Sequence, residues 1–288
     1  MKTIQKPLIP QGWLKALIYF LVVSLIVYVF QIAGSFVMNE FKPGSETGDN
    51  SVLAFGVFYA VMGIFIIIFT GLMRRFIDRK SFESLGFARK GYSNEAGLGF
   101  FSALGLLGIG SMILVTAGYL SFIAATFNAG SLLLEIAIMM VVAFVEELIF
   151  RGYLLNNLMQ SMNKWGALSI TAALFSLFHG SNPDVTLFAV INIFLAGVLL
   201  GINYIFTKNL WFSIFFHFAW NYFQGPILGY DVSGLKLTSL LQQSVSGSET
   251  WTGGPFGFEG SLLCPLLFIV AIIVFAFAFN KRYKQQTL

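Results

Sequence analysis

Charged residues are scarce in this sequence. Only 10% of its 288 residues are Asp, Glu, Lys or Arg, whereas a soluble domain carries about 25%. So few charges cannot cover the surface of a water-soluble fold of this size. The single cysteine, Cys264, excludes an intramolecular disulfide and a cysteine-rich metal site. With only two histidines in the chain, any site that needs imidazole has only two candidates.

Most residues of the chain are apolar. They make up 57% of the chain, with 33 phenylalanines and a mean hydropathy of +0.80. They form eight apolar runs, at 13–38, 52–73, 96–120, 132–158, 165–177, 185–206, 210–223 and 262–279. This pattern predicts an all-α, polytopic membrane helix bundle of about eight transmembrane helices. We find no boundary that would divide residues 1–288 into two domains, and the motifs described below lie within about 130–225.

The basic residues predict the orientation of the bundle. Threading eight spans in turn puts five basic clusters on one side: Lys2, Lys6 and Lys15; Arg74, Arg75, Arg79, Lys80, Arg89 and Lys90; Lys164; Lys208; and Lys281, Arg282 and Lys284. The opposite connections are acidic on balance, with Glu40, Lys42, Glu46, Asp49, Asp184, Asp231, Lys236, Glu249 and Glu259. By the positive-inside rule both termini are cytoplasmic. The net charge of +4 therefore indicates topology and not nucleic-acid binding. The Gly/Ser-rich segment 225–260 is expected to be a flexible external loop.

Glutamates and an arginine stand inside the fourth run, where burying an ionisable group costs at least ~2.5–3.5 kcal/mol. In the stretch EELIFR, Glu147 and Arg151 are four residues apart and can pair on one helical face. Glu146 then points about 100° away and is free to act as a general base. The reverse pairing, of Arg151 with Glu146, also stays open. For Glu135, earlier on the same helix, we expect snorkelling to the external interface.

The two histidines lie in later apolar runs. His179 ends the stretch FSLFH, and His217 begins HFAWN, which places Asn221 on the same helical face. Carboxylate, imidazole and amide groups from three spans can together hold and activate a water or a metal. Counting residues puts Glu146 and His179 roughly 22 Å from the cytoplasmic edge and His217 roughly 13 Å. A cavity open to the cytoplasm would reconcile these depths.

Three spaced motifs occur in order on successive runs: Glu-Glu-x-x-x-Arg from Glu146, Phe-x-x-x-His from Phe175, and His-x-x-x-Asn from His217. In this order they resemble the CAAX protease and bacteriocin-processing family, also called the ABI family, of intramembrane proteases. The resemblance implies an integral, multi-pass protein, and we expect it in the plasma membrane of a prokaryote. Its implied partners are membrane lipids and a membrane-associated peptide or protein substrate, with no nucleic acid.

The resemblance also implies a role for each motif residue. Glu146 would activate the attacking water, His179 would hold that water or a metal, and His217 and Asn221 would complete the site. Glu147 and Arg151 would support it. The implied metal is Zn²⁺ held by His179, His217 and Glu146, but a His-Glu-x-x-His motif is missing. Metal-free activation of water is therefore favoured over zinc, and the cofactor stays open.

We therefore expect an intramembrane CAAX-type endopeptidase that cleaves a membrane-associated or lipid-anchored peptide with a glutamate-activated water. A non-catalytic immunity or adaptor protein on the same scaffold is the alternative, but that protein would tolerate loss of Glu146 or of a histidine. A proton-coupled transporter also places ionisable residues at depth. It commonly shows internal repeats, and none is found in this sequence.

Overall fold

The computed structural model describes residues 6–40, 49–88 and 92–284, and helices dominate it. Each apolar run of the sequence forms a helix, and the longer helices are α1 (Gly12–Glu40), α2 (Asp49–Leu72), α3 (Ser93–Thr116), α4 (Ala129–Glu147), α6 (Lys164–Phe178), α7 (Leu187–Ile202), α9 (Trp211–Tyr222) and α11 (Leu263–Lys284). Shorter elements extend or connect them: η1 (Met73–Ile77), η2 (Phe82–Leu85), η3 (Leu148–Leu155), α5 (Asn156–Leu158), α8 (Tyr204–Thr207), η4 (Phe223–Ile227), α10 (Glu249–Thr252), η5 (Gly254–Phe256) and η6 (Phe258–Gly260). The prediction of a mainly helical fold is therefore confirmed.

Five helical segments in the described part of the chain are long and apolar enough to cross a membrane, namely Gly12–Gly34, Val52–Ile77, Asn94–Thr116, Leu187–Thr207 and Leu263–Tyr283. Apolar side chains on their surfaces are widely exposed, as a lipid-facing surface requires: Leu21, Phe101 and Phe277 are 59%, 70% and 70% exposed. The helices α4, α6 and α9 are not among these segments, because α4 carries three glutamates and α6 and α9 are short. The chain therefore has the features of a multi-pass membrane protein. Eight spans with cytoplasmic termini stay a prediction.

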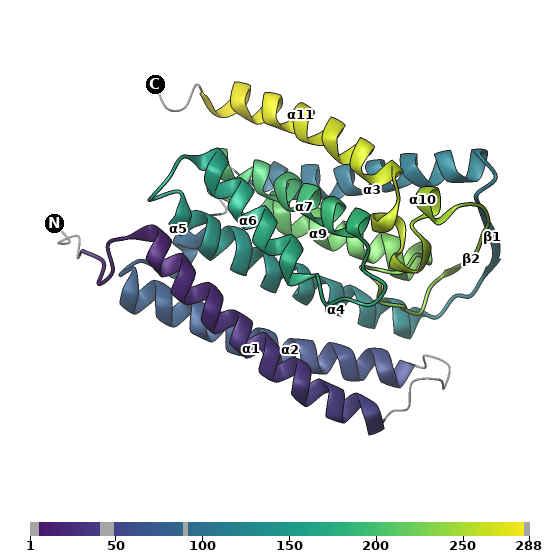
Figure 1. The fold of residues 1–288 in the computed structure, drawn as a ribbon, viewed down its shortest axis with the longest axis horizontal. Helices are drawn as coiled ribbons and strands as arrows, with labels where there is room; N and C mark the ends of the chain where they lie inside the picture. The colour runs from purple at the N-terminus through teal and green to yellow at the C-terminus, as the bar shows by residue number, and fades with distance from the viewer. Residues whose placement is uncertain (1–5, 41–48, 89–91, 285–288) are drawn as a thin grey trace.

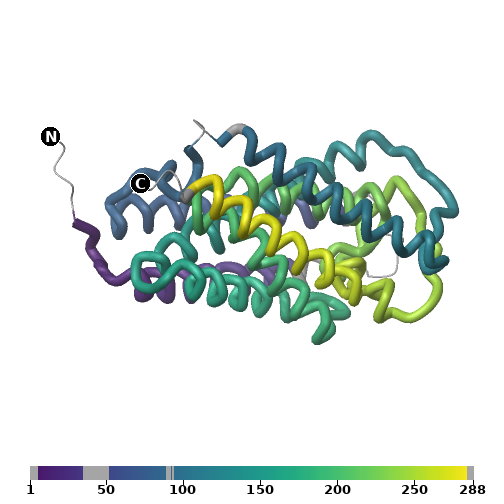
Figure 2. The backbone as a smooth tube through the Cα atoms, turned by 90° about the horizontal axis from the view of Figure 1, so that it is seen from above, coloured from purple at the N-terminus to yellow at the C-terminus, as the bar shows by residue number. Residues whose placement is uncertain are grey.

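The helices form a layered bundle (Figure 1). The α1–α2 pair lies on one side, α4, α6, α7 and α9 form the middle, and α3 and α11 cover the other side. The start of α1 and the end of α11 lie at the same end of the molecule in both views (Figures 1 and 2). Among the charges used to predict orientation, Lys2, Lys42, Glu46, Arg89 and Lys90 lie outside the described residues.

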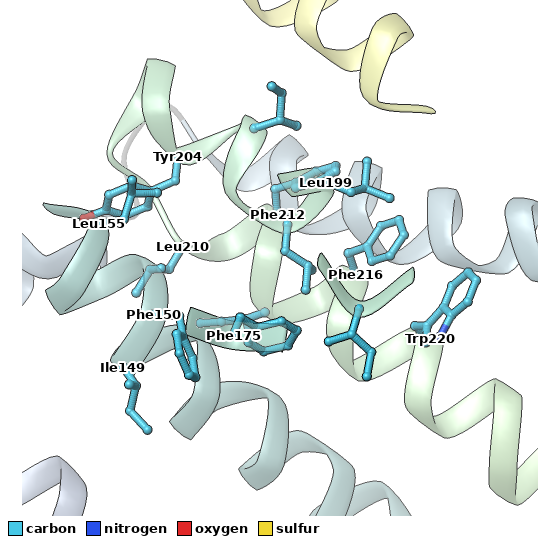
Figure 3. Packing of buried hydrophobic residues seen from close by; sticks show 14 of the residues in the cluster. Ile149, Phe150, Leu155, Phe175, Leu199, Tyr204, Leu210, Phe212, Phe216 and Trp220 are labelled. Carbon is cyan, nitrogen blue, oxygen red and sulfur yellow. The ribbon is translucent and has the colours of Figure 1, made fainter. Parts of the chain in front are cut away.

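Aromatic side chains fill the middle of the bundle. Figure 3 shows Phe150 and Phe175 close together, and their ring centroids are 5.0 Å apart. Phe212 of α9 contacts Phe275 of α11 in an edge-on arrangement, with centroids 5.2 Å apart. The helices α3 and α9 lie close together at Gly99, where an added Cβ would lie 2.2 Å from the Phe212 carbonyl oxygen. A residue without a side chain is therefore needed there, as is common where membrane helices pack.

A buried charge cluster fixes the start of α1 to the rest of the bundle. The Lys15 ammonium lies 2.7 Å from Asp78 Oδ1, and Arg74 Nη1 lies 3.1 Å from Asp78 Oδ2. All three side chains are buried. Asp78 is thus the shared counter-ion of two buried cations from α1 and η1, so these elements are tied together electrostatically.

Two features differ from the all-α prediction. A short antiparallel sheet joins β1 (Leu120–Ala125) to β2 (Leu241–Val245). The segment predicted to be a flexible loop, 225–260, contributes β2 and three short helical turns. It also buries the rings of Phe256 and Phe258 against the bundle. The segment therefore has local structure and packs apolar side chains into the helices, while its flexibility and external position stay predictions.

Candidate active site

The candidate site begins where α4 changes into a π-helix. Glu146 and Glu147 are the last residues of α4, and η3 follows at once. Short π-helical turns inserted in α-helices are frequent at functional sites. Consecutive helical residues point about 100° apart, so the two carboxylates face different surroundings. Glu146 lines a cavity, whereas Glu147 is fully buried.

Glu147 pairs with Arg151, as the four-residue spacing predicted. Arg151 Nη1 lies 2.8 Å from Glu147 Oε1. The same guanidinium donates from Nη2 to the Gly197 carbonyl oxygen at 2.9 Å and lies over the Phe175 ring at 4.6 Å. The ion pair, the hydrogen bond and the cation–π contact together offset the cost of burying this arginine. The pairing of Arg151 with Glu147 is thereby confirmed, and the reverse pairing is not seen.

His217 connects this ion pair to Glu146. Its Nδ1 lies 2.9 Å from Glu147 Oε1, and its Nε2 lies 3.9 Å from Glu146 Oε2. Since the Glu147 oxygen also accepts from Arg151, His217 Nδ1 carries the proton and donates it to Glu147. A neutral His217 therefore presents the lone pair of Nε2 toward Glu146.

His179 reaches the same point from the end of α6. It is the residue at which α6 stops, and its Nδ1 donates to the Phe175 carbonyl oxygen at 2.8 Å. Its Nε2 lies 3.7 Å from Glu146 Oε2. A helix of 15 residues is only about 22 Å long, which is shorter than the ~30 Å hydrocarbon core. If α6 begins at the membrane edge, its end and His179 therefore lie at membrane depth.

Three polar atoms thus converge on one point: Glu146 Oε2 and the Nε2 atoms of both histidines. The distances of 3.7 and 3.9 Å are too long for direct hydrogen bonds. Glu146 Oε2 is buried and makes no hydrogen bond to a described residue. Such spacing suits one small group, such as a water, bridging the three atoms.

The other oxygen of Glu146 has a partner that the sequence did not reveal. Tyr59 of α2 donates from its hydroxyl to Glu146 Oε1 at 2.9 Å. Tyr59 lies in a long apolar run and belongs to none of the three motifs. The sequence around it therefore did not indicate a role in the site. The bond fixes the glutamate and leaves Oε2 directed to the histidines.

A cavity of about 380 Å³ surrounds these groups. Glu146, His179, His217 and Asn221 all line it, so the structure brings together the four residues predicted to be catalytic. The Asn221 amide makes no hydrogen bond to any described residue and is free to meet a substrate. Most of the remaining wall is apolar, contributed by α1, α2, α4, α6, α7 and α9.

Part of this wall comes from segments predicted to lie outside the cytoplasm. Ser181, Asn182 and Pro183 follow α6, and Ser233 and Leu237 follow α9. The charge pattern places both segments on the side opposite the basic clusters. A cavity opening to the cytoplasm therefore remains only a prediction.

Glu135 does not behave as expected. It is fully buried in α4, so the expected snorkelling to an exposed interface is wrong. It is also absent from the residues that line the cavity. The structure thus separates Glu135 from the candidate site, even though it shares a helix with Glu146.

The three converging side chains, His179, His217 and Glu146, are of the types that bind metals. Two imidazoles and one carboxylate match zinc ligands in kind. As the side chains stand, however, no group of three His, Cys, Asp or Glu residues in the described ranges is placed to hold a metal ion. In this placement the three side chains do not fit a bound zinc.

Residues 127–223 match the sequence model of a family described as type II CAAX prenyl endopeptidase Rce1-like. The matched range contains all three motifs, from Glu146 to Asn221. The resemblance to CAAX proteases is therefore confirmed over this part of the chain. Comparison with curated proteins and with solved structures found no similar protein.

Proposed function

From the family match and the geometry of the cavity, we propose that this chain is an intramembrane endopeptidase of the CAAX type. It would cleave a membrane-associated or lipid-anchored peptide with a water activated by Glu146. One observation carries the proposal. The free oxygen of Glu146 faces the Nε2 atoms of His179 and His217 across 3.7 and 3.9 Å, inside a largely apolar cavity.

In the proposed reaction Glu146 acts first as a general base. Its Oε2 takes a proton from the water, and the oxygen of that water forms a bond to the scissile carbonyl carbon. The second proton of the water is donated to the Nε2 lone pair of His179 or of His217, which holds the water in line with Glu146. The carbonyl oxygen becomes an oxyanion, which accepts a hydrogen bond from the free amide of Asn221. The carbon–nitrogen bond then breaks, and the proton on Glu146 passes to the leaving amine.

Glu147 and Arg151 act through His217. Because Glu147 accepts the Nδ1 proton of His217, the imidazole is held with its Nε2 lone pair toward the water. Arg151 fixes Glu147 in turn. Such outer partners orient a functional histidine and set its tautomer. We therefore assign Glu147 and Arg151 as positioning residues.

The proposal is tested with purified protein in proteoliposomes and a library of labelled membrane peptides. Wild type is compared with E146Q, with H179A and with E249Q, a control that alters an exposed glutamate of the 225–260 segment. We expect wild type and E249Q to cleave at least one peptide that E146Q and H179A leave intact. If all four proteins give the same products, the proposal fails and the adaptor alternative gains support. Running the assay with and without a chelator addresses the metal separately.

A further inference from the structure

An open recess with basic walls lies where α2 and η1 end, away from the candidate active site. It has a volume of about 590 Å³ and is lined by Leu8, Arg75, Phe76, Arg79, Lys80 and Ser81. The backbone nitrogen of Leu8 donates to the Ile77 carbonyl oxygen at 2.9 Å, which holds the segment before α1 against the end of η1. None of the lining residues also lines the cavity that contains Glu146. This basic recess is therefore a separate feature, and the proposed reaction does not use it.

The basic recess lies at the level of a membrane interface. One segment long enough to cross a membrane, Gly12–Gly34, begins shortly after Leu8, and another, Val52–Ile77, ends beside Arg79. The start of α1 and the end of α2 lie together at one end of the bundle (Figure 1). Phospholipid headgroups occupy the layer just outside the hydrocarbon core. A group bound in the recess would therefore lie among the headgroups.

The three cations of the basic recess have no acidic partner in the part of the chain that the structure describes. Arg75, Arg79 and Lys80 are exposed and form no ion pair there. Asp78, the neighbour of Arg79 in the chain, is buried and already binds two other cations. Glu83 of the following turn does not line the recess. Like charges held this close repel one another, so an anion among them would be stabilised.

The pKa of Lys80 reflects this excess of positive charge. Partial loss of hydration lowers the pKa of Lys80, and Arg74 lowers it further. Lys15 and Lys208 act in the same direction, and only Asp78 opposes them. Lys80 lies outside the apolar segment that ends at Ile77. A bound anion would favour the charged ammonium and so raise this pKa again.

An exposed apolar surface continues from the basic recess along α2. It consists of four side chains at four-residue intervals, each about half exposed: Ile64, Ile68, Leu72 and Phe76. Residues spaced by four lie on one face of a helix. A soluble anion would contact only the cations, whereas a phospholipid would also place an acyl chain against this face. The two features together therefore favour a lipid over a soluble anion.

We propose that the basic recess binds the headgroup of an anionic phospholipid whose acyl chain lies along the exposed apolar face of α2. The headgroup phosphate accepts hydrogen bonds from the guanidinium groups of Arg75 and Arg79 and from the ammonium group of Lys80. The basic clusters predict that this end of the bundle is cytoplasmic, and anionic lipids are a feature of the cytoplasmic leaflet. This inference does not depend on the proposed protease function.

The first test compares two lipids that differ only in their headgroup. Full-length protein in a neutral detergent is titrated with dioleoyl phosphatidylglycerol or with dioleoyl phosphatidylcholine, and binding is followed by native mass spectrometry. We expect the first phosphatidylglycerol to bind roughly ten- to a hundredfold more tightly than the first phosphatidylcholine. Inorganic phosphate at the same concentration should not displace it. Equal affinities would overturn the inference, and displacement by phosphate would show a site for soluble anions instead.

The second test assigns the preference to the basic recess. R79Q/K80Q removes two of its cations, and K236Q/K281Q removes two exposed cations elsewhere. We expect the first variant to lose roughly tenfold of the preference for phosphatidylglycerol and the control to keep it. Both should unfold at the wild-type temperature without added lipid, because the replaced side chains are exposed and form no described ion pair. An equal loss in the control would mean that net charge alone attracts the lipid, and the inference would fail.

A charge-preserving variant separates charge from shape. R79K/K80R keeps both cations and should retain most of the preference for phosphatidylglycerol. If it loses as much of the preference as R79Q/K80Q, the recess does not recognise the charge of the headgroup and the inference is wrong.

Discussion

His217 Nδ1 lies 2.9 Å from Glu147 Oε1, which joins the buried ion pair of the bundle to the candidate catalytic group. The two residues are 70 positions apart in the sequence. The contact turns an apparently structural glutamate into the residue that orients a histidine. The two adjacent glutamates thus have different roles, because Glu146 lines the cavity whereas Glu147 is fully buried among other side chains.

Replacing Glu146 by glutamine should therefore lower activity, whereas replacing Glu147 by glutamine should lower stability. E146Q should lower kcat by ~10²–10⁴-fold, the range for loss of a general base, with little change in thermal stability. E147Q leaves Arg151 buried without its counter-ion and should destabilise the protein by about 3–5 kcal/mol. Thermal unfolding in detergent together with peptide cleavage checks both. The assignment is wrong if E146Q is the less stable variant or the more active one.

Tyr59→Phe removes only the hydroxyl that donates to Glu146 Oε1. We expect kcat/KM to fall by roughly three- to tenfold, since a hydrogen bond contributes about 0.5–1.5 kcal/mol. Y28F, which alters an exposed tyrosine of α1, is the matched control and should be neutral. Unchanged kinetics in Y59F would mean that the hydroxyl does not orient the glutamate during the reaction.

Asn221→Ala should slow the chemical step without weakening the bundle. The amide has no described partner to lose, and removal of one oxyanion donor costs about 10²–10³-fold in kcat. The expected signature is a lower kcat with a KM near that of wild type, measured with a peptide that wild type cleaves. A loss confined to KM would assign Asn221 to substrate binding instead.

Asp78→Asn should destabilise the protein at a distance from the site. It removes the shared counter-ion of Lys15 and Arg74, and breaking a buried pair costs about 3–5 kcal/mol. The folded fraction of D78N should still cleave peptide at the wild-type rate per folded molecule. E83Q, in an exposed position of the adjacent η2 turn, serves as the control and should melt with wild type.

Asp231 gives a pH-dependent prediction for the segment after α9. Burial raises the pKa of Asp231 above its ordinary value, opposed by Lys236 and reinforced by Asp184. A raised folded-state pKa means that the folded protein binds this proton more tightly than the unfolded chain. The associated stability is present at acidic pH and is lost as pH rises through the folded pKa. D231N should therefore melt above wild type at neutral pH, and the two should converge at acidic pH; a gap that is the same at both pH values contradicts this.

The features that could be predicted from the sequence are those that depend on residues close together in the chain. The apolar runs gave the helices, because a helix satisfies its backbone hydrogen bonds locally and a bilayer accepts its apolar side chains. The four-residue spacing of Glu147 and Arg151 gave their ion pair, since residues so spaced share a helical face. The order of the motifs gave the family resemblance and the four cavity residues.

The contacts between those residues depend on the packing of distant segments and could not be predicted from the sequence. Tyr59 reaches Glu146 from another helix, and Glu259 reaches Trp220 from a segment that looked like a flexible loop. Neither contact has a local sequence signal, because each depends on how distant elements pack. Burial likewise separated the glutamates of α4: Glu135 and Glu147 are enclosed, and Glu146 faces the cavity. The sequence supplied the ionisable groups, and the packing of the bundle determined which of them can meet a substrate.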